Sequence, residues 1–305
     1  MQKGPLPLGR IITFLVLAYG TAWAFVLGLP PTVPFTVRGA LAMLAPAVAA
    51  AAIRGPLFRE GFADSGLTPN ISRSWRTYVI SYAIAPALIF AGFWLSTAVG
   101  IQHWGVQSID VVLKAFGNIA PPAHASAQDL TQHIPLAAVV AIALAGLTVS
   151  IPINMIFTFG EEFGWRGYLL VRLAPLGRTK AALLVGIIWG LWHAPLIAVF
   201  GYVYPGHPVA GIFMMTLYTT PMSIIFAWLR FKSNSVWPST IAHAANNAQA
   251  MLAYMVLSPA DSLLRPPGGA IALVPIVAFA TWIIMTDRLE EREGGISPEP
   301  SAEAA

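Results

Sequence analysis

Residues 147–168 read LTVSIPINMIFTFGEEFGWRGY, a long apolar run that ends in two adjacent acids. No charged residue occurs between Leu147 and Gly160. Glu161 and Glu162 then follow, and the next charge is Arg166. Ionisable groups at membrane depth are costly, so each one is by default a candidate functional residue. The stretch therefore predicts a membrane-spanning helix that carries a functional site.

The composition of the whole chain indicates the same class of protein. Of 305 residues, 57% are hydrophobic and only 10% are charged, compared with about 25% charged in soluble domains. The mean hydropathy is +0.70. This balance predicts an all-α, polytopic transmembrane helical bundle. The net charge of +4 is too modest to indicate a nucleic-acid partner. The sequence contains no cysteine, which excludes disulfides and a thiol nucleophile.

About eight segments are apolar and long enough to be spans, for which roughly 20 residues are needed. They are 11–30, 39–53, 77–100, 136–171, 181–203, 209–229, 238–258 and 270–286. The fourth is too long for one straight crossing, and Pro152 is expected to kink or split it. A short helix is expected near Val111–Phe116. We predict one membrane domain over residues 1–286, with its motif core at 150–250, and a disordered acidic tail at 287–305.

The basic residues fix the orientation of these spans. With the N-terminus inside, thirteen basic residues fall in inside segments and three, Arg38, Lys114 and Arg265, fall outside. Cytoplasmic loops carry an excess of Lys and Arg. Both termini are therefore predicted to be cytoplasmic.

Polar side chains in three separate spans are predicted to meet at one depth. At 1.5 Å per helical residue, their distances from the inside loops come to about 12–20 Å, which is a layer in the inner half of the bilayer. The residues are Glu161, Glu162, Arg166, His193, His243 and Asn247, with Asn154 and Asn246 as lesser members. Each alone is compatible with a structural hydrogen bond or ion pair. Their shared depth favours a functional site.

Helical spacing separates the two acids. Glu162 and Arg166 are four residues apart and can pair on one helix face. Glu161 points about 100° away around the helix and is free to act as a base. His243 and Asn247 are also four residues apart and share a face.

Glycines are predicted to let these helices approach closely. They lie at positions 160, 164 and 167 in one span and at 186 and 190 in another. Trp189 and Trp192 are interpreted as packing residues.

Three motifs carry a resemblance to a known family. GEEFGWRGYLL, IIWGLWHAPL and SVWPSTIAHAANNA resemble the motifs of the CAAX protease and bacteriocin-processing enzyme family. These are intramembrane endopeptidases related to the type II CAAX prenyl protease. The family pattern is Glu-Glu-x-x-x-Arg, aromatic-x-x-x-His and His-x-x-x-Asn. Trp189 stands where Phe is usual, and the first 150 residues match only in being transmembrane.

The resemblance implies a role for each motif residue. Glu161 with His193 would activate a water for attack on a peptide carbonyl, and His243 with Asn247 would donate hydrogen bonds to the oxyanion. Glu162 and Arg166 would hold the first motif in shape. The family is described as glutamate-type proteases that need no metal or other cofactor. The expected partners are a membrane-associated peptide or protein and the bilayer, in the inner membrane of a prokaryotic cell.

Three other functions stay open from the sequence. Glu161, His193 and His243 form a possible two-histidine, one-carboxylate zinc set, although the HExxH spacing of common zinc proteases is absent. A non-catalytic membrane scaffold or immunity protein would have no need of Glu161. A proton-coupled transporter is disfavoured, since we find no internal repeat.

Overall fold

The computed structural model describes residues 6–117 and 126–289, and this part of the chain is an all-α bundle without β-strands. The first part contains α1 (Leu8–Gly28), α2 (Phe35–Ala52) with the π-helical turn η1 (Ile53–Leu57), α3 (Ile71–Ala98) and α4 (Ile109–Gly117). The second begins with α5 (Ala127–Thr131), α6 (Leu136–Leu147), α7 (Ser150–Gly164), the π-helical turn η2 (Trp165–Leu169), α8 (Leu170–Leu173) and the 3₁₀ turn η3 (Ala174–Leu176). It continues with α9 (Arg178–Trp192), α10 (Ala194–Phe200), α11 (Ala210–Ser233), α12 (Trp237–Val256) and α13 (Ala270–Met285).

The helices confirm a membrane-spanning bundle. Among the described residues, five helices are long and apolar enough to cross a bilayer, and a sixth crossing is formed if α6 and the helix from α7 to η3 count as one bent span. Helices also occupy the predicted seventh and eighth segments, as α12 and α13. The protein is therefore an integral membrane protein, while the number of eight spans stays a prediction. The short helix predicted near Val111–Phe116 is α4.

The fourth predicted segment is split, but not at Pro152. The break falls at Thr148 and Val149, between α6 and α7, and the two helices meet at a bend of 51°. Pro152 is the third residue of α7. In the first turn of a helix the backbone N–H has no intrahelical acceptor, so proline is tolerated there.

Close helix contacts depend on glycine, as predicted. A Cβ atom on Gly164 would lie 2.3 Å from Cβ of Pro46, and one on Gly190 would lie 2.5 Å from Cα of Thr216. The first contact joins α7 to α2, and the second joins α9 to α11. These contacts bring the helices that carry the polar motifs against their neighbours.

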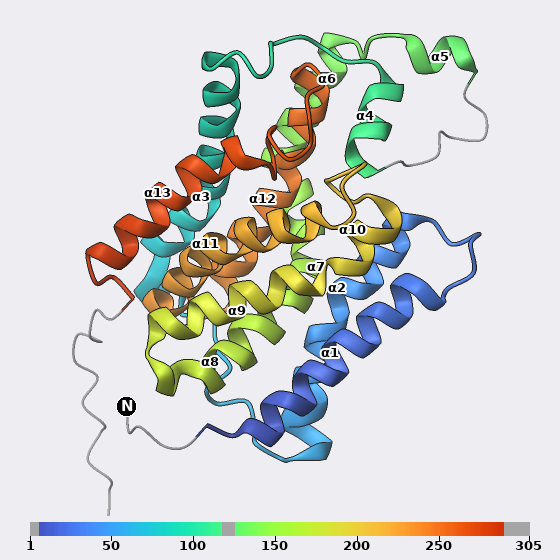
Figure 1. Ribbon diagram of the computed structural model, residues 1–305. Coiled ribbons are helices and arrows are strands. Elements are labelled where there is room, and N and C mark those ends of the chain that lie inside the picture. The colour runs from blue at the N-terminus through green and yellow to red at the C-terminus, as the bar shows by residue number, and fades with distance from the viewer. Residues whose placement is uncertain (1–5, 118–125, 290–305) are drawn as a thin grey trace, which may run out of the picture.

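The loops gather at two ends of the bundle (Figure 1). At the end that we call the basic end, loop 58–70 contacts the start of α12, where the Val236 amide donates to the Gly66 carbonyl at 2.9 Å. At the opposite end, loop 257–269 contacts loop 201–209, where the Tyr204 hydroxyl donates to the Gly268 carbonyl at 2.9 Å. The α1–α2 turn reaches the same end, since Phe35 packs on Tyr202. Of the predicted tail, residues 290–305 lie outside the described residues.

Candidate active site

The first motif straddles the end of α7 and η2, where it forms a buried ion pair. Arg166 Nη1 donates to Glu162 Oε1 at 2.8 Å, and both side chains are fully buried. This is the pair that the four-residue spacing predicts. The Arg166 guanidinium also lies over the rings of Trp189 and Phe226, at 4.6 and 5.0 Å from their centroids. Two aromatic faces thus help to compensate the desolvation of this cation.

Glu161 has different surroundings from Glu162. Its carboxylate accepts a hydrogen bond from Trp189 Nε1 at 2.6 Å. The interpretation of Trp189 as a packing residue was therefore incomplete, because its indole N–H also binds the acid. The only sequence signal for this role is the position of Trp189, four residues before His193. The family pattern has an aromatic residue there and does not specify an N–H donor.

His193 lies at the junction of α9 and α10. Its Nδ1 is 2.9 Å from the Trp189 carbonyl oxygen, which can only accept, so Nδ1 carries the proton and donates. The other ring nitrogen, Nε2, is then the acceptor in the neutral imidazole. The ring stacks on Tyr202 with an interplanar angle of 8°.

His243 on α12 contacts the buried ion pair. Its Nδ1 is 2.9 Å from Glu162 Oε1, the same oxygen that accepts from Arg166. Glu162 therefore links the first motif to the third, which is more than the local brace that the sequence predicted. The His243 ring is also in contact with Trp189 and Phe226.

Asn247 lies at the end of a short hydrogen-bond chain. The Tyr218 hydroxyl donates to Asn246 Oδ1 at 2.8 Å, and Asn246 Nδ2 donates to Asn247 Oδ1 at 3.3 Å. The amide nitrogen of Asn247 is then left as a donor. Tyr218 was missed by the sequence analysis, because it lies on α11 outside the motifs and a tyrosine in a span is common.

One cavity brings the motif residues together. It has a volume of about 330 Å³, and Glu161, His193, His243 and Asn247 all line it. Glu162 and Arg166 do not line it. The cavity is thus lined by a carboxylate, two imidazoles and an amide. Among the described residues, Glu161 and His193 form no direct hydrogen bond with each other. Such a site has room for a water and a peptide group.

The donors in this cavity were also considered as metal ligands. Among the residues that the structure describes, no three His, Asp or Glu side chains are grouped so that they could share a metal ion. Glu161 is instead bound by Trp189, and His243 faces Glu162. The zinc set considered from the sequence is thus not assembled in this geometry.

Comparisons with known proteins find a family that matches the segment carrying the three motifs. Residues 132–249 match the family model described as Type II CAAX prenyl endopeptidase Rce1-like. This segment is similar to the Rce1-like family, and it covers less than half of the 305 residues. It includes all three motifs, from Glu161 to Asn247.

A second comparison, with a single known protein, points to the same family. Over 77 residues the chain is 38% identical to CAAX prenyl protease 2 of Methanococcus maripaludis. The aligned segment is 24% of this chain and 28% of the relative. The likeness to this relative therefore covers about a quarter of either protein.

Proposed function

We propose that the protein is an intramembrane endopeptidase that hydrolyses peptide bonds of membrane-associated peptides or proteins. One observation carries the proposal: the buried carboxylate of Glu161, His193, His243 and Asn247 line one cavity within a transmembrane bundle. The Rce1-like motifs and the name of the Methanococcus maripaludis relative support it. The site of action is the inner membrane of a prokaryotic cell.

Glu161 and His193 are the groups that activate water. Trp189 occupies one carboxylate oxygen of Glu161, which leaves the other for a water molecule in the cavity. His193 presents the acceptor Nε2, because Nδ1 donates to a backbone carbonyl. A carboxylate and a neutral imidazole that face one water can remove its proton as it attacks a peptide carbonyl carbon.

His243 and Asn247 stabilise the oxyanion that develops on the carbonyl oxygen. The amide nitrogen of Asn247 is the free donor of its hydrogen-bond chain. His243 can donate from Nε2 when both ring nitrogens carry protons, while its Nδ1 stays hydrogen-bonded to the Glu162 carboxylate. Donors fixed in a site without bulk water lower the barrier most effectively.

The proposal assigns the reaction to protein groups alone, with no metal ion. The competing hypothesis is a zinc-dependent protease that binds the metal with Glu161, His193 and His243. Activity of the purified protein that survives chelation and gel filtration, with less than one metal ion per chain by elemental analysis, supports the proposal. Activity that is lost on chelation and restored by zinc overturns this part of it.

Comparative proteomics of membrane fractions tests the function itself. Cells that make the wild-type protein are compared with cells that make Glu161→Gln at equal abundance. We expect new protein termini that occur with the wild type only. If Glu161→Gln keeps the full cellular function and the same termini, the protein is a scaffold or immunity factor and the proposal is wrong.

A further inference from the structure

A hydrogen-bond chain between two helices reaches Asn247 from outside the three motifs. The Tyr218 hydroxyl on α11 donates to Asn246 Oδ1 at 2.8 Å, and Asn246 Nδ2 donates to Asn247 Oδ1 at 3.3 Å. All three side chains line the cavity that Glu161 also lines. The chain therefore connects a tyrosine that no motif contains to an amide of the third motif.

The order of donors and acceptors in this chain determines which atom of Asn247 is available. A side-chain amide carries a donor on one side and an acceptor on the other. If Asn246 turned over, its oxygen would face Asn247 Oδ1, so Asn247 would have to turn as well. Among the described residues, Asn246 Oδ1 is the acceptor of the Tyr218 hydroxyl, and the hydroxyl has no second hydrogen bond. This bond therefore favours the orientation in which Asn247 Nδ2 is available.

Tyr218 is held in place by the packing of α11 against α9. A Cβ atom on Gly190 would lie 2.5 Å from Cα of Thr216. One on Gly186 would lie 2.5 Å from Cα of Thr220. These two close contacts lie two residues before and two residues after Tyr218, which is itself buried. The hydroxyl is thus presented to Asn246 from a fixed part of the bundle, as pre-organised donors require.

The orientation of Asn247 matters for the chemistry proposed above. With Nδ2 available, the amide can donate to an oxygen on which negative charge develops. In the reverse orientation, Asn247 would offer its carbonyl oxygen, which repels that charge. A device that prevents the reversal therefore acts on the transition state more than on the bound substrate.

We propose that Tyr218 is a positioning residue of the peptidase, which acts through Asn246 to hold the amide nitrogen of Asn247 toward the developing oxyanion. This inference rests on the proposed function, because it presumes that Asn247 stabilises the oxyanion. It extends the site from the three motif helices to α11.

Tyr218→Phe tests the inference, because it removes the hydroxyl and keeps the ring. The purified full-length variant is assayed in detergent micelles with an internally quenched fluorescent peptide that spans a cleavage site found by the membrane proteomics. We expect kcat to fall about ten- to a hundredfold, somewhat less than for outright loss of an oxyanion donor, with KM nearly unchanged. Tyr82→Phe is the matched control, since its hydroxyl donates to the Leu147 carbonyl outside the cavity. An unchanged kcat in Tyr218→Phe overturns the inference.

A double-mutant cycle separates positioning from packing. In an Asn247→Ala background, Tyr218→Phe should cause no further loss of kcat, because no amide is left to orient. Losses that multiply overturn the inference. Asn246→Leu interrupts the same chain at its middle and should lower kcat as Tyr218→Phe does, which keeps the test available if Tyr218→Phe does not fold. A wild-type kcat in Asn246→Leu also overturns the inference.

The same variants distinguish a failure of this inference from a failure of the proposed function. If Glu161→Gln and Asn247→Ala both lose turnover while Tyr218→Phe keeps the wild-type kcat, the inference alone is wrong. If Glu161→Gln keeps full turnover of the peptide, the proposed function is wrong and the inference falls with it.

Discussion

Glu161 and Glu162 are adjacent in sequence, yet they have different neighbours. Glu161 lines the cavity and accepts from an indole N–H. Glu162 lies outside the cavity and receives both Arg166 and His243 on one oxygen. A residue that faces open space is suited to chemistry, and one that joins two buried donors is suited to holding helices in place.

The two acids should therefore respond differently to the same substitution. Glu161→Gln should abolish turnover and leave thermal unfolding in detergent unchanged, since the amide still accepts from Trp189. Glu162→Gln should lower activity and also the free energy of unfolding by about 3–5 kcal/mol, because the Arg166 charge then stays buried without its partner. Equal loss of activity with unchanged stability in both variants would contradict this division of roles.

Trp189 provides a second test at the same scale. Trp189→Phe keeps an aromatic ring but removes the hydrogen bond to Glu161. Such a bond to a charged group contributes about 1.5–3 kcal/mol, so kcat should fall about tenfold or more, with KM nearly unchanged. Trp228→Phe is the control, since the Trp228 indole nitrogen has no hydrogen-bond partner among the described residues and does not line the cavity. Similar kcat losses in both would assign the effect to packing.

At the scale of elements, glycine sets how closely α7 approaches α2. Gly164→Ala would bring its new methyl group within 2.3 Å of Pro46, which forces the helices apart. Overpacking of this kind costs about 1–3 kcal/mol, measured as a lower midpoint of thermal unfolding. Gly20→Ala in α1 has nothing within 4 Å of the new atom and should leave the midpoint unchanged or higher. A neutral Gly164→Ala would show that the contact is not needed.

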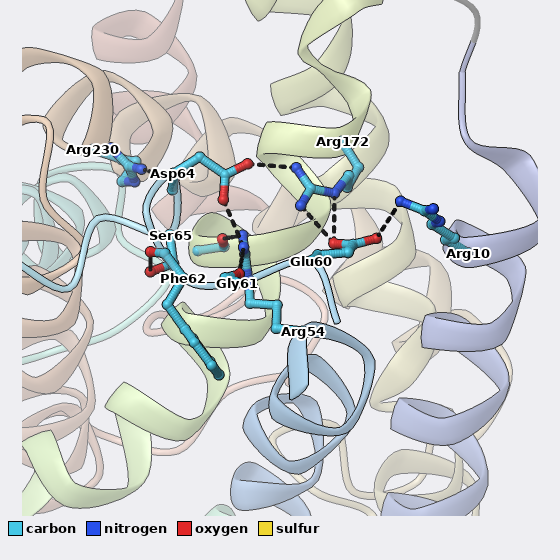
Figure 2. Close-up of polar contacts among 10 residues, drawn as sticks. Arg10, Arg54, Glu60, Gly61, Phe62, Asp64, Ser65, Arg172 and Arg230 are labelled. Carbon is cyan, nitrogen blue, oxygen red and sulfur yellow. Dashed lines mark hydrogen bonds and ion pairs between the residues drawn. The ribbon is translucent and has the colours of Figure 1, made fainter. Parts of the chain in front are cut away.

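At the basic end, Arg54 and Arg172 both pair with Asp64 (Figure 2). These ion pairs should make stability depend on pH. Burial alone would raise the pKa of Asp64, but hydrogen bonds and charges from Arg172 and Arg54 outweigh it and lower the pKa below its usual 3.8. A carboxyl whose pKa is lowered on folding stabilises the protein above its unfolded pKa, and this contribution is lost as the pH falls through the folded pKa.

Asp64→Asn should consequently reduce stability at pH 7, by about 1 kcal/mol for a partly exposed pair. The difference from the wild type should shrink as the pH falls below 3.8. Thermal unfolding at pH 7 and below pH 3.8 measures this difference. The control is Asp110→Asn, because Asp110 forms an exposed ion pair with Lys114. A difference that stays constant down to low pH would mean that Asp64 is not ionised in its pairs with Arg54 and Arg172.

The features that the sequence predicted correctly are those that depend on local spacing along the chain. Apolar length predicts the helices, and the four-residue separation predicts the Glu162–Arg166 pair, because helix geometry alone fixes both. The Trp189–Glu161 bond joins α9 to α7, and the Tyr218 chain joins α11 to α12. Such contacts depend on how helices rotate against one another, which spacing within one helix does not determine. The break at Thr148 and Val149 was misplaced to Pro152 for a related reason, since proline is harmless in a first turn.

At the scale of the whole molecule, one buried cavity explains why a charge-poor bundle keeps these polar residues. Glu161, His193, His243 and Asn247 line it, whereas Glu162 and Arg166 lie outside it. Protein buries Glu161, His193 and His243 away from bulk water, which strengthens each electrostatic contact within the site.

Hydrolysis in H₂¹⁸O is the measurement that tests the central claim most directly. Membranes that contain the wild-type protein or Glu161→Gln are incubated in labelled water, and newly formed peptide C-termini are analysed by mass spectrometry. The account predicts new C-termini that carry one ¹⁸O with the wild type and are missing with Glu161→Gln. The same labelled termini at the same rate in both samples would contradict a peptidase in which Glu161 activates the attacking water.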